Sequence, residues 1–140
     1  GISQISGGSR TSVGGYATPE PKEENSAQFD ISDTRTLDEV VNWLLDMGHI
    51  PSFCTACYRA GRTGDRFMSL VKSGQIANCC APNALMTLKE YLEDYASADT
   101  RAKGEVLIQK ELKHIPNPKI KEIAARNLKE IIEGKRDFRF

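Results

Sequence analysis

The chain has 140 residues, of which 39% are hydrophobic, and this is enough for one domain with a modest core plus a tail or linker. Basic and acidic residues number 19 each, so the charge balance gives no reason to expect nucleic acid or an anionic membrane as a partner. No run approaches the roughly 18 apolar residues of a membrane span. No basic and apolar leader opens the chain. We therefore expect a soluble, cytoplasmic protein.

Residues 1–35 differ in composition from the remainder of the chain. The β-branched residues at the start predict a short strand, and a glycine-rich loop able to approach a ligand follows it up to Tyr16. This opening looks like the end of a larger sheet or barrel, although a flexible glycine–serine leader is the alternative. Proline and acidic residues then predict a linker over residues 17–35.

From residue 36 to residue 140 the sequence predicts a small helical domain. Thr36 and Glu39 fit a capping box, and apolar residues recur at helical spacing until Gly48 ends the first helix. Trp43 is interpreted as a core or interdomain anchor. A short second helix is predicted over residues 65–72, with apolar side chains directed inward at Phe67, Leu70 and Val71.

Three further helices complete the prediction. The third runs from Pro82, in its first turn, to about Ala96. The fourth follows the cap Asp99 and the fifth follows the cap Asn117, and Gly134 ends the last one. The predicted buried stripe of the third helix consists of Leu85, Leu88, Tyr91, Leu92 and Tyr95.

Four cysteines lie near the middle of the chain, as the pairs Cys54/Cys57 and Cys79/Cys80. Neither pair suits the disulfide framework of a small secreted module, and in a reducing compartment this spacing indicates metal or redox chemistry. A thioredoxin-like dithiol is disfavoured because no parallel strands are predicted around it. A Cys-x-x-Cys turn lets two thiolates converge on one metal or cluster.

The ligand count separates zinc from iron. A structural zinc site needs four ligands, which here would come from the second cysteine pair or from His49 or His114. Adjacent side chains diverge, however, His49 is typical of a surface turn, and His114 suits the end of a helix dipole. Three thiolates without a fourth protein ligand suit a 4Fe-4S cluster with one iron left open for an external molecule.

Charged residues and glycines accompany the first cysteine pair. Three arginines follow it: Arg59, Arg62 and Arg66. They would offset the negative charge of a thiolate-bound cluster or hold an anionic ligand, and salt bridges to Asp65 and neighbouring acids are the alternative. Gly61 and Gly64 fit a backbone that packs close to something bulky.

At this point the residues resemble a known family. The string Cys-Thr-Ala-Cys-Tyr-Arg-x-Gly-Arg-Thr-Gly-Asp-Arg-Phe-Met, the Cys-x2-Cys-x22-Cys spacing and the opening Ile-Ser-Gln-Ile-Ser are similar to the carboxy-terminal part of the radical S-adenosylmethionine (SAM) tyrosine lyases that mature [FeFe]-hydrogenase. The resemblance covers essentially the whole chain. It implies a mainly α fold, with residues 1–16 as the last strand and loop of a TIM-type barrel and residues 36–140 as an auxiliary-cluster domain.

The resemblance also implies a function. Such a lyase cleaves tyrosine to p-cresol and dehydroglycine, converts dehydroglycine to carbon monoxide and cyanide, and assembles an iron–carbonyl–cyanide unit for other hydrogenase maturation proteins. SAM and a second 4Fe-4S cluster belong to the barrel, whose Cys-x3-Cys-x2-Cys motif is absent here. This chain alone is therefore not expected to be active. Its expected share is an auxiliary 4Fe-4S cluster that holds an additional iron through a free cysteine ligand.

Carried over residue by residue, the resemblance implies that Cys54, Cys57 and Cys80 bind the auxiliary cluster. Cys79 falls outside the motif and is interpreted as a free, buried thiol. Ser9 and Thr11 fall in the loop after the last barrel strand, where they would contact tyrosine or the nucleoside cofactor. The alternative from another functional class is a non-enzymatic, zinc-binding helical interaction module.

Overall fold

The computed structural model describes Ile5, Gly7, Gly8 and residues 35–140, and every regular element among them is a helix. The mainly α prediction is therefore confirmed. Apart from Ile5, Gly7 and Gly8, the predicted strand and glycine-rich loop, with nearly all of the predicted linker, lie outside the described residues. No helix in the described part of the chain has both the length and the apolar character needed to cross a membrane.

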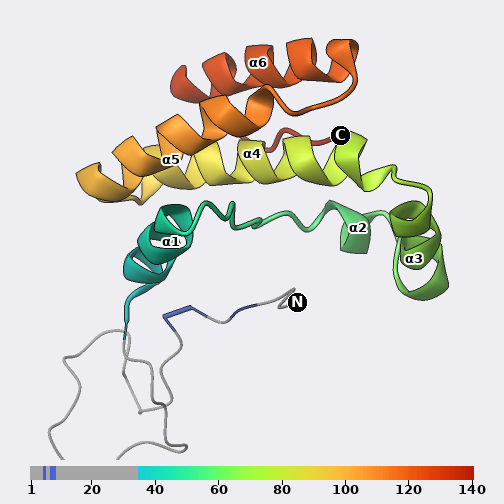
Figure 1. The fold of residues 1–140 in the computed structure, drawn as a ribbon, viewed down its shortest axis with the longest axis horizontal. Helices are drawn as coiled ribbons and strands as arrows, with labels where there is room; N and C mark the ends of the chain where they lie inside the picture. The colour runs from blue at the N-terminus through green and yellow to red at the C-terminus, as the bar shows by residue number, and fades with distance from the viewer. Residues whose placement is uncertain (1–4, 6, 9–34) are drawn as a thin grey trace, which may run out of the picture.

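Six helices follow one another along the chain (Figure 1). They are α1 (Leu37–Asp46), α2 (Ala56–Arg59), α3 (Gly64–Lys72), α4 (Ile76–Asp94), α5 (Ala98–Leu112) and α6 (Pro118–Ile132).

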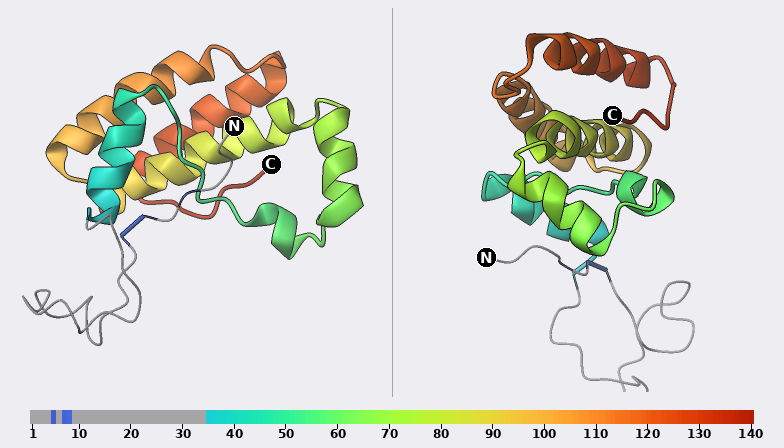
Figure 2. Two further views of the ribbon diagram at one scale, coloured as in Figure 1. Left: turned by 60° about the horizontal axis from the view of Figure 1, so that its bottom comes forward. Right: turned by 90° about the vertical axis from the view of Figure 1, so that its right-hand side faces the viewer.

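Four of the helices form a bundle around one core. Helix α4 packs on α5 and α6, and α1 packs on α5. The short helices α2 and α3 lie at the end of the molecule where α4 begins, away from α1 (Figures 1 and 2). The largest fully buried apolar side chains of the core are Met86, Leu88, Leu92, Ile108, Ile131 and Val41.

The first helix is capped as predicted. The Thr36 hydroxyl accepts a hydrogen bond from the backbone N–H of Glu39, and the Glu39 carboxylate accepts one from the backbone N–H of Thr36 at 2.6 Å. Trp43 is 41% exposed, with the Arg35 guanidinium 4.6 Å from the centroid of its ring. Trp43 is therefore not a core residue within the described structure.

Helix α4 begins at Ile76, six residues before the predicted start at Pro82. A proline suits the first turn of a helix, but Pro82 is accommodated inside this helix and is buried. The prediction that Tyr95 is buried is also wrong: it lies just past the helix end and is 77% exposed. The early start has a consequence for the cysteines, because Cys79 and Cys80 become helical residues.

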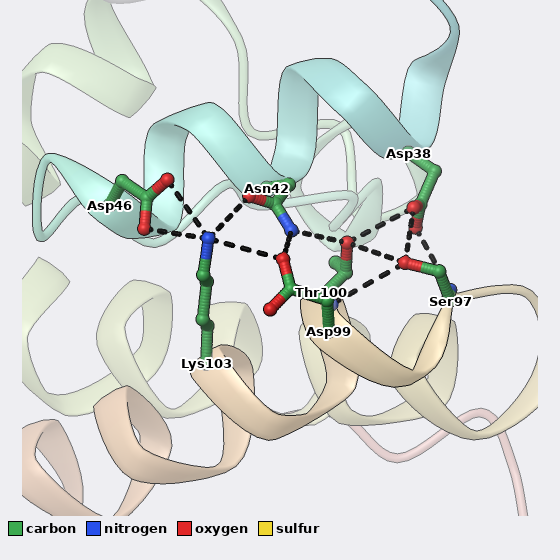
Figure 3. A network of polar contacts seen from close by, with 7 residues as sticks. All are labelled: Asp38, Asn42, Asp46, Ser97, Asp99, Thr100 and Lys103. Carbon is green, nitrogen blue, oxygen red and sulfur yellow. Dashed lines mark hydrogen bonds and ion pairs between the residues drawn. The ribbon is translucent and has the colours of Figure 1, made fainter.

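Helix α5 is capped by Ser97 and not by Asp99, which lies within its first turn. The Ser97 hydroxyl accepts a hydrogen bond from the backbone N–H of Thr100 and donates one to the Asp38 carboxylate at 2.7 Å. The hydroxyl of Thr100, which is fully buried, also donates to Asp38, at 3.0 Å. Figure 3 shows how these contacts fasten the start of α5 to α1.

A lysine extends this polar junction along α1. The Lys103 ammonium donates to the Asn42 amide oxygen at 2.8 Å and lies 2.9 Å from the Asp46 carboxylate (Figure 3). The Asn42 amide group in turn donates to Asp99 at 2.7 Å. Helices α1 and α5 are thus joined by a continuous set of charge-assisted hydrogen bonds.

The chain after α6 turns back and runs along α4 (Figure 1). At its end, the backbone N–H of Phe140 donates to the side-chain oxygen of Asn83, which is only 3% exposed, at 2.8 Å. The sequence indicated only a basic and aromatic tail. Further contacts that hold this tail include Arg136 to Asp94 and the backbone N–H of Asp137 to Glu90.

Candidate metal centre

The segment before the first cysteine is anchored on α4. The backbone N–H of Phe53 donates to the Thr87 hydroxyl at 3.2 Å, and the Phe53 ring stacks on Tyr91 with the ring centroids 5.2 Å apart. Cys54 is therefore attached to a residue that the central helix of the bundle holds in place.

Helix α2 carries the second cysteine of the motif. The backbone N–H of the buried Ala56 donates to the Cys54 sulfur at 3.4 Å. Gly61, with a φ of 62°, ends the helix in a Schellman turn in which the backbone N–H of Arg62 donates to the carbonyl of Cys57 at 2.8 Å. This hydrogen bond ties the backbone of Arg62 to the backbone of Cys57.

The two glycines of the motif have a conformational role. Gly61 and Gly64 both have positive φ, of 62° and 55°, and an added Cβ atom would meet nothing within 4 Å at either position. No protein atom of the described residues therefore packs against either position, so the bulky neighbour that was expected is not one of these protein atoms. Their left-handed backbone is what requires glycine.

The second cysteine pair lies near the start of α4. The sulfur atoms of Cys79 and Cys80 are 3.8 Å apart, both thiols are free and both are half-buried. Burial, a hydrogen bond with Cys79 and the nearby Cys79, Cys57 and Cys54 thiols raise the pKa of Cys80 to about 11. The Cys57 and Cys54 thiols thus lie close enough to Cys80 to contribute to its raised pKa.

The described residues contain no group of three or more His, Cys, Asp or Glu side chains arranged to hold a single metal ion. A cubane cluster makes a different demand, because each iron takes its own thiolate and the ligand sulfurs stand around the cluster instead of meeting at one point. His49 is exposed, and His114 is also exposed and lies 3.5 Å from Glu111 within its own helical turn.

The three arginines of the motif have different surroundings. The exposed Arg59 pairs with Asp137 of the carboxy-terminal tail at 3.0 Å, and not with Asp65 as the salt-bridge alternative expected. Arg66 is exposed. Arg62 alone among them has a buried polar atom that lacks a hydrogen-bond partner within the described part of the chain, namely its Nε.

Sequence reasoning overlooked two contributors near the thiols. The side-chain oxygen of Asn78, immediately before the cysteine pair, is buried without a hydrogen-bond partner. The tail reaches α2 through Asp137, which no local pattern in the sequence indicates because the contact joins residues 78 positions apart. The predicted substrate residues Ser9 and Thr11 lie outside the described residues.

Comparisons with known proteins relate the chain to a solved structure. No protein-family model matches the sequence, and no curated protein matches it either. A solved structure described as HydG, a maturase of the [FeFe]-hydrogenase, superposes with a TM-score of 0.88 at 49% sequence identity. The match covers 100% of this chain and 30% of the HydG chain, so this chain spans less than a third of its relative. The chain is therefore homologous, over its whole length, to part of HydG.

Proposed function

We propose that this chain forms the auxiliary-cluster part of a radical SAM tyrosine lyase that takes part in [FeFe]-hydrogenase maturation. The observation that carries the proposal is the 49% identity to part of HydG over the whole chain. The contribution of the Cys57 and Cys54 thiols to the raised pKa of Cys80 supports it. In this proposal the whole protein cleaves tyrosine to p-cresol and dehydroglycine, and makes carbon monoxide and cyanide from the latter. Residues 36–140 form the cluster domain, and residues 1–16 complete the barrel.

The donor set fits a 4Fe-4S cluster. Its three thiols are free, half-buried and of the soft ligand type that iron–sulfur clusters prefer. Within the described residues, Arg62 Nε and Asn78 Oδ1 are buried without partners, and both belong to the segments that carry the thiols. When bound, such a cluster would supply an iron that is open to an external ligand, which we propose to be an additional iron held through a free cysteine.

The residues of this chain would hold and orient that cluster. Cys54 and Cys57 come from a turn that the Phe53–Tyr91 stack and the Phe53–Thr87 hydrogen bond fix on α4. Cys80 comes from α4 itself. The backbone N–H of Ala56 donates to the Cys54 sulfur and so helps to orient it. One ligand segment is therefore fastened to the helix that supplies the other, which limits how far the three thiols can separate.

The remaining parts of the proposal lie outside this chain. SAM and its own 4Fe-4S cluster would be bound by the barrel, with tyrosine as the substrate and Ser9 and Thr11 at the rim of its site. Free cysteine, iron and the other hydrogenase maturation proteins are the proposed partners. The proposed location is the cytoplasm.

Anaerobic reconstitution of the intact protein with iron and sulfide tests this function. The control is a variant in which Cys54, Cys57 and Cys80 are all serine. Subtracting its iron content from that of the wild type removes the iron of any cluster bound elsewhere in the protein. We expect the wild type to hold about four more irons per chain than the control. Its electron paramagnetic resonance (EPR) spectrum should also change when cysteine is added. Stoichiometric zinc with no such difference in iron would refute the proposal and favour the zinc-binding interaction module.

A further inference from the structure

Two buried polar atoms in the described part of the chain lack a hydrogen-bond partner: Nε of Arg62 and Oδ1 of Asn78. A buried polar group without a partner costs about 1–3 kcal/mol relative to one that is satisfied. Native proteins retain few such groups, and a redox or catalytic role is one recognised reason for keeping one. The place of these two atoms in the chain therefore indicates where a bound group could satisfy them.

Both atoms belong to the segments that carry the thiols. The backbone of Arg62 is bonded to the carbonyl of Cys57 by the Schellman turn, at 2.8 Å. Asn78 lies in the first turn of α4, directly before Cys79 and Cys80. The bundle of α1, α4, α5 and α6 buries several other polar side chains, such as Thr100 and Asn83, and those have partners.

The two groups also have the chemistry that sulfur ligands require. Arginine Nε carries only a donor hydrogen, and the charged guanidinium remains protonated under all ordinary conditions. The oxygen and nitrogen of an asparagine amide exchange places when the amide turns over, so Asn78 can present its NH2 group at the buried position. Thiolate and sulfide sulfurs are acceptors, and hydrogen bonds to them tune an iron–sulfur cluster.

We infer that Arg62 and Asn78 are positioning residues that donate hydrogen bonds to the sulfurs of the cluster held by Cys54, Cys57 and Cys80. This inference rests on the function proposed above. Arg62 is selected over its neighbours because Arg59 is paired with Asp137 at the surface and Arg66 is exposed. Both donors stabilise the negative charge that the cluster gains on reduction.

The test compares Arg62→Met with Arg66→Met in the reconstituted intact protein, again after subtraction of the triple-serine control. Loss of an outer hydrogen-bond partner lowers metal affinity by roughly 10- to 100-fold. Arg62→Met should therefore release its cluster iron to a chelator faster by a factor in that range, and the midpoint potential of the cluster should become more negative. Arg66→Met should match the wild type in both measurements. Asn78→Leu should shift both in the same direction as Arg62→Met.

A second measurement separates this role from a purely structural one. In protein without iron and sulfide, Arg62→Met removes an unsatisfied buried donor, so its melting temperature should equal or exceed that of the wild type. A structural role predicts a lower melting temperature in that protein. Equal iron release and equal potential in Arg62→Met and the wild type would overturn the inference while leaving the proposed function intact. A wild type that binds no cluster would overturn both.

Discussion

At the scale of single residues, the candidate centre depends on which member of the vicinal cysteine pair faces the α2 segment. Successive residues of a helix point in directions about 100° apart, so Cys79 and Cys80 do not share one orientation. The Cys54 and Cys57 thiols both contribute to the raised pKa of Cys80. On this ground we propose Cys80, and not Cys79, as the third ligand beside the first motif.

The vicinal pair gives a discriminating prediction. Cys80→Ser should abolish the auxiliary cluster, because a hydroxyl does not replace a thiolate as a soft ligand for iron. Cys79→Ser should retain it, which makes this variant the matched control. Iron and acid-labile sulfide per chain, together with the EPR spectrum, measure the outcome. Loss of the cluster in Cys79→Ser and its survival in Cys80→Ser would assign the ligand role to Cys79 instead.

The sequence predicted the candidate ligands but not their surroundings. Cys54, Cys57 and Cys80 can be recognised because residue type and the Cys-x2-Cys-x22-Cys spacing are both visible in the sequence. The different environments of Arg59 and Arg62 are not, because they depend on where the tail lies and on how the turn after α2 closes. Burial of an individual side chain is a property of the packed structure.

At the scale of elements, local signals predicted helices well where a cap marks the start. The capping box of α1 and the Asn117–Pro118 start of α6 are both present in the structure. The start of α4 was misplaced because a proline is permitted in the first turn but is not confined to it. The residues from Ile76 to Pro82 carry no cap of their own, since Gln75 makes no side-chain capping bond.

The close approach of α4 and α5 predicts the effect of one small substitution. A Cβ atom at Gly104 would lie 2.4 Å from Cδ1 of Leu92, a side chain that is only 1% exposed. Overpacking costs about 1–3 kcal/mol and the helix propensity gained over glycine returns about 1 kcal/mol. Gly104→Ala should therefore lower the free energy of unfolding by up to about 2 kcal/mol, as measured by urea denaturation.

Two comparisons make the packing origin of this effect testable. The loss in Gly104→Ala should be smaller in a Leu92→Ala background, because the clashing side chain is gone and residues in contact are not additive. Ala102→Gly, at an exposed site on the same helix, should lose about 1 kcal/mol from propensity alone. A Gly104→Ala protein that is more stable than the wild type would show that α4 and α5 can separate without cost.

At the scale of the whole molecule, an ionic network inside the bundle joins α4 to α5. The Lys89 ammonium, almost fully buried, lies 2.7 Å from the Glu93 carboxylate and also pairs with Glu105. Glu93 pairs in addition with Arg101. Because two carboxylates and two cations alternate, each buried charge has a partner, which is the condition under which burial of charge is tolerated.

This network predicts how stability changes with pH. Burial raises the pKa of Glu93, but hydrogen bonds from Lys89 and Arg101 outweigh it and leave the pKa below its ordinary value of 4.5. Hydrogen bonds also lower the pKa of Asp94, through Arg136, and of Asp99, through Asn42 and Lys103. A carboxyl group whose pKa is lower in the folded state contributes stability above its unfolded pKa and loses it as the pH falls through the folded pKa.

The melting temperature should therefore change little between pH 7 and pH 5 and fall steadily below about pH 4.5. Glu93→Gln should reduce the free energy of unfolding at pH 7 by about 1.5–3 kcal/mol, the range for a hydrogen bond to a charged group. As the pH falls towards 3, the wild-type glutamate becomes neutral like glutamine, so the difference between the two proteins should shrink towards zero. Glu122→Gln is the matched control, because Glu122 is exposed on α6 and forms no ion pair within the described part of the chain. A wild-type advantage over Glu93→Gln that persists at pH 3 would mean that the side chain at this position stabilises the bundle through packing and not through its charge.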